Sequence, residues 1–186
     1  KTPQGIELRV HPTLLDEESI IANVNGVMNA VMVNGDAVGS TLYYGAGAGA
    51  GPTASAVVAD IIDVARMISS PQSGVPALAF QDDSLSDMPI LAMDDVISAY
   101  YLRITALDKV GVLADITEIL GKCEINIEAI IQKEPRGPDA NSKRVPVIIL
   151  THEIREATMN KAIAFSEALD GVAEKVTRIR VYRLED

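Results

Sequence analysis

A run of glycines before a helical pattern is the first feature that can do chemistry. The stretch YGAGAGAGPTAS, residues 44–55, alternates glycine with alanine and then reaches Pro52. Glycine lets the backbone adopt positive φ and approach a ligand closely, and proline suits the first turn of a helix. Because a helix N-terminus offers unpaired N–H groups and partial positive charge, a strand, this turn and the next helix would cradle a phosphate or a dinucleotide.

The same glycines have a purely structural interpretation. Gly45, Gly47 and Ala50 satisfy the loose dinucleotide-binding spacing, but the second strand ending in an acidic residue that should follow is missing. Glycines at this position also allow a strand to pack tightly on a helix without any ligand. The pattern alone leaves both interpretations open.

A second candidate site is the stretch LDKVGVL, residues 107–113, between a strand pattern and a helix pattern. Gly111 leaves the opening N–H groups of the helix accessible, and these groups can receive a small carboxylate. Asp108 beside them can hold an ammonium group. Together they describe an amino-acid pocket, although Asp108 can also serve only as a helix cap.

Other catalytic or metal-binding sets do not emerge from the sequence. The two histidines, His11 and His152, lie far apart, and His11 before a proline suggests a structural turn. A single cysteine, Cys123, forms no internal disulfide and no zinc site by itself. The net charge is −10, with nearly all of the acidic excess before residue 96, so neither half has the basic surplus of a nucleic-acid-binding protein.

The elements that position these residues differ between the two halves. In the first half we expect strands at 6–10, 27–33 and 40–44, in an antiparallel or mixed sheet, and a helix from Pro52 to about Ser69. The region 70–98 mixes Pro, Ser, Gly and Asp without a sustained period and is predicted to be a linker.

In the second half strands and helices alternate clearly. We expect strands at 100–106, 125–132, 145–151 and 177–184 and helices at 112–122 and 156–169, the βαββαβ order of ferredoxin-like folds. Residues 134–142 are rich in turn formers and predict a mobile hairpin connection. In the last strand Arg178 and Arg180 alternate with Ile179 and Val181, which predicts one buried face and one solvated face.

Three segments of the first half resemble the last part of the catalytic region of bacterial homoserine dehydrogenase. They are GIELRVHPTL, NGVMNAVMVNGDAVG and YYGAGAGAGPTASAVVADIIDVAR, at residues 5–14, 25–39 and 43–66. The resemblance implies that the glycine loop lies against the nicotinamide end of NAD(P). Gly49 is then the expected backbone contact, with Gly45 and Gly47 supporting the turn. The family's nucleotide fingerprint and catalytic lysine are absent from this sequence, so we expect no catalytic residue, no tight cofactor binding and no activity for this chain alone.

The stretch YYLRITALDKVGVLADITEILGKCEINIEAIIQ, residues 100–132, resembles the first half of an ACT domain, a regulatory module that binds amino acids. The resemblance implies an effector site in the loop after the first strand and at the start of the second strand, often across a dimer of edge-to-edge sheets. The matching residues are Asp108, Gly111, Val112, Leu113 and, from the neighbouring subunit, Asn126. Some effector-binding members carry a histidine where this chain has Ala106.

The fold class expected from these patterns is α+β or α/β: a truncated mixed-sheet catalytic segment (1–69), a linker (70–98) and a ferredoxin-like ACT domain (99–186). The favoured function is the C-terminal part of a cytoplasmic homoserine dehydrogenase with threonine as effector, forming homo-oligomers through the ACT sheets. The alternative is a non-enzymatic amino-acid sensor whose first 66 residues serve for dimerisation. A phosphate-binding protein built on the glycine run is a third hypothesis. No membrane partner, nucleic acid or metal is expected.

Overall fold

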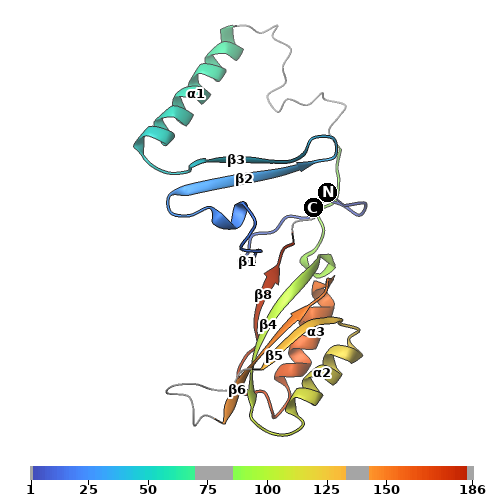
Figure 1. The fold of residues 1–186 in the computed structure, drawn as a ribbon. Coiled ribbons are helices and arrows are strands. Elements are labelled where there is room, and N and C mark those ends of the chain that lie inside the picture. Colours follow the sequence, from blue (N-terminus) through green and yellow to red (C-terminus); the bar gives the residue numbers. More distant parts are fainter. Residues whose placement is uncertain (1, 70–85, 133–142, 184–186) are drawn as a thin grey trace. The chain divides into compact units, whose positions relative to one another are not determined.

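The chain divides into two compact units in a computed structural model that describes residues 2–69, 86–132 and 143–183 (Figure 1). One unit combines Lys1–Leu15 with Met88–Asp186, and the other is Asp16–Asp87. The division places the first fifteen residues with the C-terminal half of the sequence rather than with the glycine run.

The larger unit is built on one sheet with the strand order β1-β8-β4-β6-β5, and β7 pairs with the start of β4. β1 runs parallel to β8, and the remaining pairs are antiparallel. The strands are β1 (Thr13–Leu14), β4 (Ile97–Leu107), β5 (Ile127–Gln132), β6 (Arg144–Thr151), β7 (Ile154–Arg155) and β8 (Thr177–Val181).

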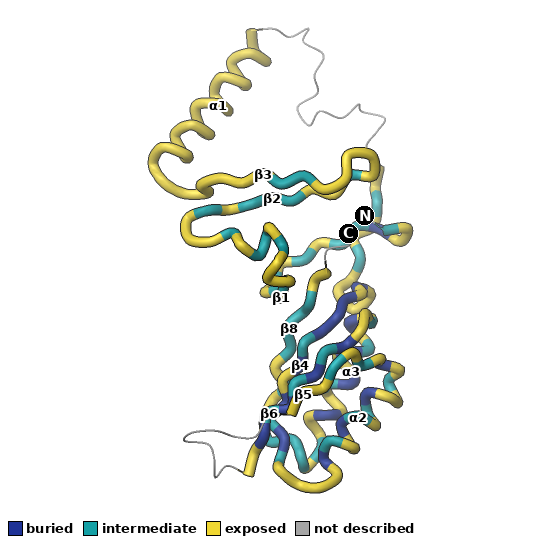
Figure 2. The backbone as a smooth tube through the Cα atoms, in the orientation of Figure 1, coloured by how far each residue is buried: buried dark blue, intermediate teal, exposed yellow. Residues whose placement is uncertain are grey.

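Two helices cover one face of this sheet, α2 (Val112–Lys122) and α3 (Glu156–Glu167) (Figure 1). Alternate residues of β4 point toward them and are at most 2% exposed, namely Tyr100, Leu102, Ile104 and Ala106. Ile116 and Leu120 of α2, with Met159 of α3, complete this core. Apolar residues recur every second position in the strand and every 3.6 positions in the helices, and they pack together in one apolar layer. This layer appears as the dark region of Figure 2.

The smaller unit contains a hairpin and one long helix. β2 (Met28–Gly35) pairs antiparallel with β3 (Gly39–Ala46), and α1 spans Ala50–Ser69. The 3-10 helix η1 (Ile21–Asn23) precedes β2. None of the residues of α1 is buried, so its apolar face has no cover among the residues that the structure describes.

Most of the predicted elements are confirmed, including α2 with its predicted bounds and the βαββαβ order of the ACT fold. The strand predicted at 6–10 is wrong. Ile6 forms only an isolated bridge with Ile90, because Leu8 and Val10 are largely exposed and have no sheet face to bury. The regular strand comes after His11-Pro12, as β1, and was not predicted.

Part of the predicted linker and all of the predicted hairpin connection, 134–142, lie outside the described residues. The described end of the linker region contains the 3-10 helix η3 (Met93–Asp95), and its last two residues, Ile97 and Ser98, already belong to β4. Among the described helices, none combines the length and the apolar character that crossing a membrane requires.

Candidate functional site

The glycine turn joins β3 to α1, and its three candidate glycines have different environments. Gly49 has φ of 122°, a conformation that side chains disfavour. A Cβ on Gly47 would lie 1.9 Å from Nδ2 of Asn29, so this glycine permits close contact with the neighbouring strand β2. Gly45 has open space around it. The turn thus needs glycine at two positions, once for conformation and once for space.

All three glycines are exposed, and so is the start of α1. The Thr53 N–H donates to the carbonyl of Gly49 at 3.1 Å, which closes the first turn of the helix. The exposed backbone at a helix N-terminus fits the close approach of a nicotinamide or phosphate group, because nothing in the described part of the chain covers it. The residues present therefore fit a cofactor contact of the kind predicted.

The second predicted site is the loop between β4 and α2. Gly111 is the N-cap residue of α2 with φ of 96°, so it adopts the left-handed conformation that glycine favours. The Asp115 N–H donates to the Gly111 carbonyl at 2.9 Å, whereas the N–H groups of Leu113 and Ala114 form no hydrogen bond with a described residue. These two donors are available for a carboxylate.

Asp108 is exposed and does not cap the helix. No side-chain hydrogen bond caps α2, and the Asp108 carboxylate has no partner among the residues that the structure describes. Its backbone is held, because the Asp108 N–H donates to the carbonyl of Lys143 at 2.7 Å. Among the described residues, the loop therefore combines an unpaired carboxylate on a held backbone with N–H groups that have no partner a few residues further along the chain.

Packing beneath the loop fixes its position. The Leu107 N–H donates to the carbonyl of Gly171 at 2.7 Å. A Cβ on Gly171 would lie 2.8 Å from the methyl groups of Val112. The turn after α3 therefore packs directly against Val112, the buried first residue of α2. Val112 is therefore a support for the loop. Leu113 is half-buried and packs against the core, and Asn126 is exposed just before β5.

Ala106, at the position where related domains can carry histidine, is 2% exposed and belongs to the core of the sheet. Asp108 and Gly111 lie in the loop after β4, and Val112 and Leu113 are the first two residues of α2. Asn126 lies on a different connection, before β5, and its predicted place is in the site of a neighbouring subunit. The two predicted sites belong to different units.

A buried ionic cluster at the N-terminus of α3 escaped the sequence analysis. The Glu156 carboxylate accepts hydrogen bonds from the Tyr100 hydroxyl at 2.7 Å and from Nε and Nη2 of Arg180 at 3.0 and 2.6 Å. Arg178 contributes an ion pair at 2.9 Å. The prediction that both arginines face solvent is wrong, because their side chains are 25% and 14% exposed and neutralise a carboxylate that is 4% exposed.

This cluster changes the acidity of its members. Burial raises the pKa of Glu156, but the hydrogen bonds from Tyr100 and Arg180 and the charges of Arg178 and Arg180 outweigh burial, so that its pKa lies below the ordinary value. Burial and the hydrogen bond to Glu156 raise the pKa of Tyr100 well above its ordinary value. Only the sequence position of Glu156, at a helix start, hinted at a special role.

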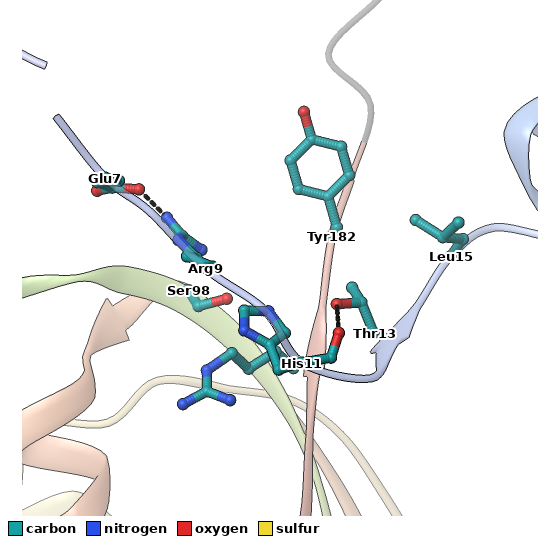
Figure 3. A pocket seen from close by; sticks show the side chains of 8 residues that line it. Glu7, Arg9, His11, Thr13, Leu15, Ser98 and Tyr182 are labelled. Atoms are coloured by element: carbon teal, nitrogen blue, oxygen red, sulfur yellow. Dashed lines mark hydrogen bonds and ion pairs between the residues drawn. The ribbon is translucent and has the colours of Figure 1, made fainter. Parts of the chain in front are cut away.

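A cavity of about 430 Å³ lies beside this cluster within the larger unit (Figure 3). Its lining includes Glu7, Arg9, His11, Ser98, Arg180 and Tyr182. His11 was interpreted as a turn residue, and its place on a cavity wall could not be predicted without the β1–β8 pairing. Among the described residues, no group of three or more histidine, cysteine, aspartate or glutamate side chains is arranged to hold a metal ion.

Comparison with known proteins agrees with both resemblances. The family model described as Homoserine dehydrogenase matches residues 2–62, and the ACT domain model matches residues 100–165. A homoserine dehydrogenase of Pseudomonas aeruginosa is 60% identical over 185 residues, and one of Neisseria gonorrhoeae is 51% identical over 187 residues. These alignments cover 99% and 100% of this chain but 42% of each relative.

A solved structure gives the same result. The crystal structure of a homoserine dehydrogenase from Thiobacillus denitrificans matches with a TM-score of 0.86 and 57% sequence identity, over 98% of this chain and 40% of that chain. The chain thus spans about two fifths of the length of the proteins that it resembles. The family models, the sequence relatives and this structure agree that the chain belongs to the homoserine dehydrogenase family, of which it contains a C-terminal portion with an ACT domain.

Proposed function

We propose that this chain serves a homoserine dehydrogenase in two ways: residues 1–69 complete the nicotinamide side of the catalytic centre, and an ACT domain at 99–186, after a linker at 70–98, regulates it. The enzyme class interconverts L-homoserine and L-aspartate 4-semialdehyde with NAD(P), a step toward threonine and methionine that we place in the cytoplasm. The observation that carries the proposal is the 60% identity to a homoserine dehydrogenase over nearly the whole chain.

The glycine turn holds the cofactor through its backbone. NAD(P), when bound, supplies the hydride that is exchanged with the substrate. Gly49 is the proposed contact, because its φ of 122° and its exposure allow the backbone to meet a ring without an intervening side chain. Gly47 allows the turn to lie close to β2, and Gly45 supports the turn from the end of β3. The chain contributes no catalytic side chain of its own.

The loop after β4 binds the effector, for which threonine is the favoured candidate. Asp108 pairs with the ammonium group, and the N–H groups at the start of α2 receive the carboxylate. Asn126 from a second copy contributes to the same ligand. The strand β5 lies at one edge of the sheet, with Ile130 and Ile131 more than a third exposed, which favours an edge-to-edge homo-oligomer.

Feedback control then follows from linkage. A ligand shifts an equilibrium between two arrangements of the enzyme only by its difference in affinity for them. Threonine that binds more tightly to an arrangement with a misaligned catalytic cleft would lower activity by that coupling free energy. The Asp108 carboxylate is the group in this chain through which an amino acid is distinguished from a simple carboxylic acid.

Isothermal titration of the chain with L-threonine tests this proposal. We expect saturable binding that Asp108→Asn weakens by roughly tenfold, because a charge-assisted hydrogen bond to the ammonium group is lost. Asp115→Asn is the matched control, since Asp115 is an exposed carboxylate in the first turn of α2 on the other side of Gly111. Heat signals that do not depend on threonine, or equal losses in the two variants, would rule out this site.

A further inference from the structure

The cavity beside His11 lies at the opposite end of β4 from the proposed effector loop. Ser98 is the second residue of β4, whereas Asp108 follows its last residue. The cavity walls come from residues 7–15, which include β1, from the start of β4 and from the end of β8 with the residue that follows it. Neither the proposed effector loop nor the glycine turn contributes a residue to it.

The cavity collects hydrogen-bond donors that have no partner. The imidazole of His11 and the hydroxyl of Ser98 form no hydrogen bond with any residue that the structure describes, and neither group is cut off from solvent. Arg180 uses Nε and Nη2 for Glu156, which leaves Nη1 without a described acceptor. Arg9 uses only Nη2, for Glu7 and for the carbonyl of Ile97. Every fully buried side-chain N or O atom among the described residues has a partner, so these free donors are open to solvent and can meet a ligand without breaking an existing bond.

These donors are held in place before any ligand arrives. Glu156 fixes Arg180 with two hydrogen bonds, and Glu7 pairs with Arg9. The Thr13 hydroxyl bonds the carbonyl of His11, as Figure 3 shows, and β1 pairs with β8 immediately after it. Preorganised groups lose little conformational entropy on binding, so a small ligand suffices to make use of them.

At the His11 ring the charges of the two arginines outweigh the charge of Glu156. The pKa of His11 is lowered by burial, then by the positive charges of Arg180 and Arg9, and the negative charge of Glu156 opposes this only in part. Arg9 pairs with Glu7 and Arg180 with Glu156, so the groups that can meet an anion are the arginine N–H groups that these carboxylates do not use. Because Leu15 and the ring of Tyr182 add apolar surface to the lining, the cavity also accommodates a short carbon skeleton.

We propose that the cavity formed by Arg9, His11, Ser98, Arg180 and Tyr182 binds a small molecule that carries one carboxylate or phosphate group. The oxyanion accepts hydrogen bonds from Nη1 of Arg180, from Arg9 and from the Ser98 hydroxyl. The His11 ring donates to it when protonated. This site is separate from the proposed effector loop, and it does not depend on the function proposed above.

Histidine NMR on the whole chain tests the proposal, because His11 lines the cavity and His152 does not. Inorganic phosphate and sodium acetate are added in separate titrations at constant ionic strength, so that screening is unchanged. We expect a saturable shift of the His11 ring signals with at least one probe, no shift for His152, and a rise in the pKa of His11 when the anion is bound. A response to phosphate indicates that the natural ligand carries a phosphate group, and a response to acetate indicates a carboxylate group.

Two matched arginine variants make the test specific. Arg9→Gln should weaken binding by roughly fivefold to tenfold through loss of a charge-assisted hydrogen bond. Arg155→Gln makes the same change in charge at an exposed arginine that pairs with Asp95 outside the cavity, and should leave binding unchanged. Shifts that do not saturate with either probe, or equal weakening in both variants, would overturn the proposal.

Discussion

Glu156 is the residue on which the larger unit depends most. Its carboxylate is nearly inaccessible, at 4% exposure, and it lies at the first position of α3 where the helix dipole favours negative charge. Tyr100, Arg178 and Arg180 surround it with hydrogen bonds and ion pairs. A buried ion pair gives little net stability, but removing one partner leaves the others buried without compensation.

We therefore predict that Glu156→Gln lowers the free energy of unfolding by about 3 kcal/mol, because two partly buried arginines lose their counter-charge. Urea denaturation measures this change. Glu174→Gln is the control, since Glu174 pairs with Arg144 at the surface with its side chain 57% exposed and should cost less than about 1 kcal/mol. A loss of the same size in the two variants would contradict the importance of the buried cluster.

The same carboxylate predicts a pH dependence of stability. Because the pKa of Glu156 is lower in the folded chain than its ordinary value of 4.5, its contribution is fully present above that value and is lost as pH falls through the lower, folded pKa. The difference in stability between the wild type and Glu156→Gln should therefore shrink below pH 4.5, and a constant difference would count against this assignment.

Single residues were predictable where local chemistry decides. Gly49 and Gly111 both have the positive φ that their positions before helices require. Arg178 and Arg180 were misassigned because strand alternation distinguishes two faces but does not show which side chain lies opposite. Glu156 comes from a distant part of the sequence, so only the fold reveals it as their partner.

Among the elements, β1 has an effect out of proportion to its length. Its two residues extend the ACT sheet as a parallel strand, with Thr13 opposite Arg180 and Leu14 opposite Val181. The Tyr182 N–H then donates to the carbonyl of Leu14 at 3.0 Å. This short pairing covers the edge of β8. It also attaches the N-terminal segment that lines the cavity to the sheet.

Hydrogen exchange can test this pairing. Removing residues 1–14 should abolish protection of the Tyr182 amide, because its acceptor is lost, while the amide of Leu102 in the interior of β4 stays protected. Removing only residues 1–4 leaves β1 in place and should preserve the protection of Tyr182. Equal exchange of Tyr182 in the two shortened chains would show that β1 does not form in solution.

Longer elements were predicted well because periodicity specifies them. α2 has the predicted bounds, since Gly111 precedes it and its apolar residues recur on one face. Two-residue strands such as β1 and β7 carry no period, so they were missed. The alternating pattern of Ile6–Val10 was misleading, because alternation without a partner strand does not produce a sheet.

At the scale of the whole molecule, the two family models match two separate parts of the chain. Residues 2–62 match homoserine dehydrogenase, and residues 100–165 match the ACT domain. The apolar face of α1, with Val57, Val58, Ile61 and Ile62 each more than two fifths exposed, has no cover among the described residues. The sequence indicated both resemblances, but it could not place residues 1–15 in the unit with the ACT domain, because that depends on long-range pairing.

Backbone NMR of the labelled chain titrated with L-threonine tests the central claim that the loop after β4 senses an amino acid. We predict saturable shifts centred on the amides of Gly111, Leu113 and Ala114, because N–H groups without a described partner begin α2. Shifts centred on His11 and Ser98 would instead place threonine in the cavity at the other end of β4. Such a result, or no saturable shift at all, would contradict the proposed effector site.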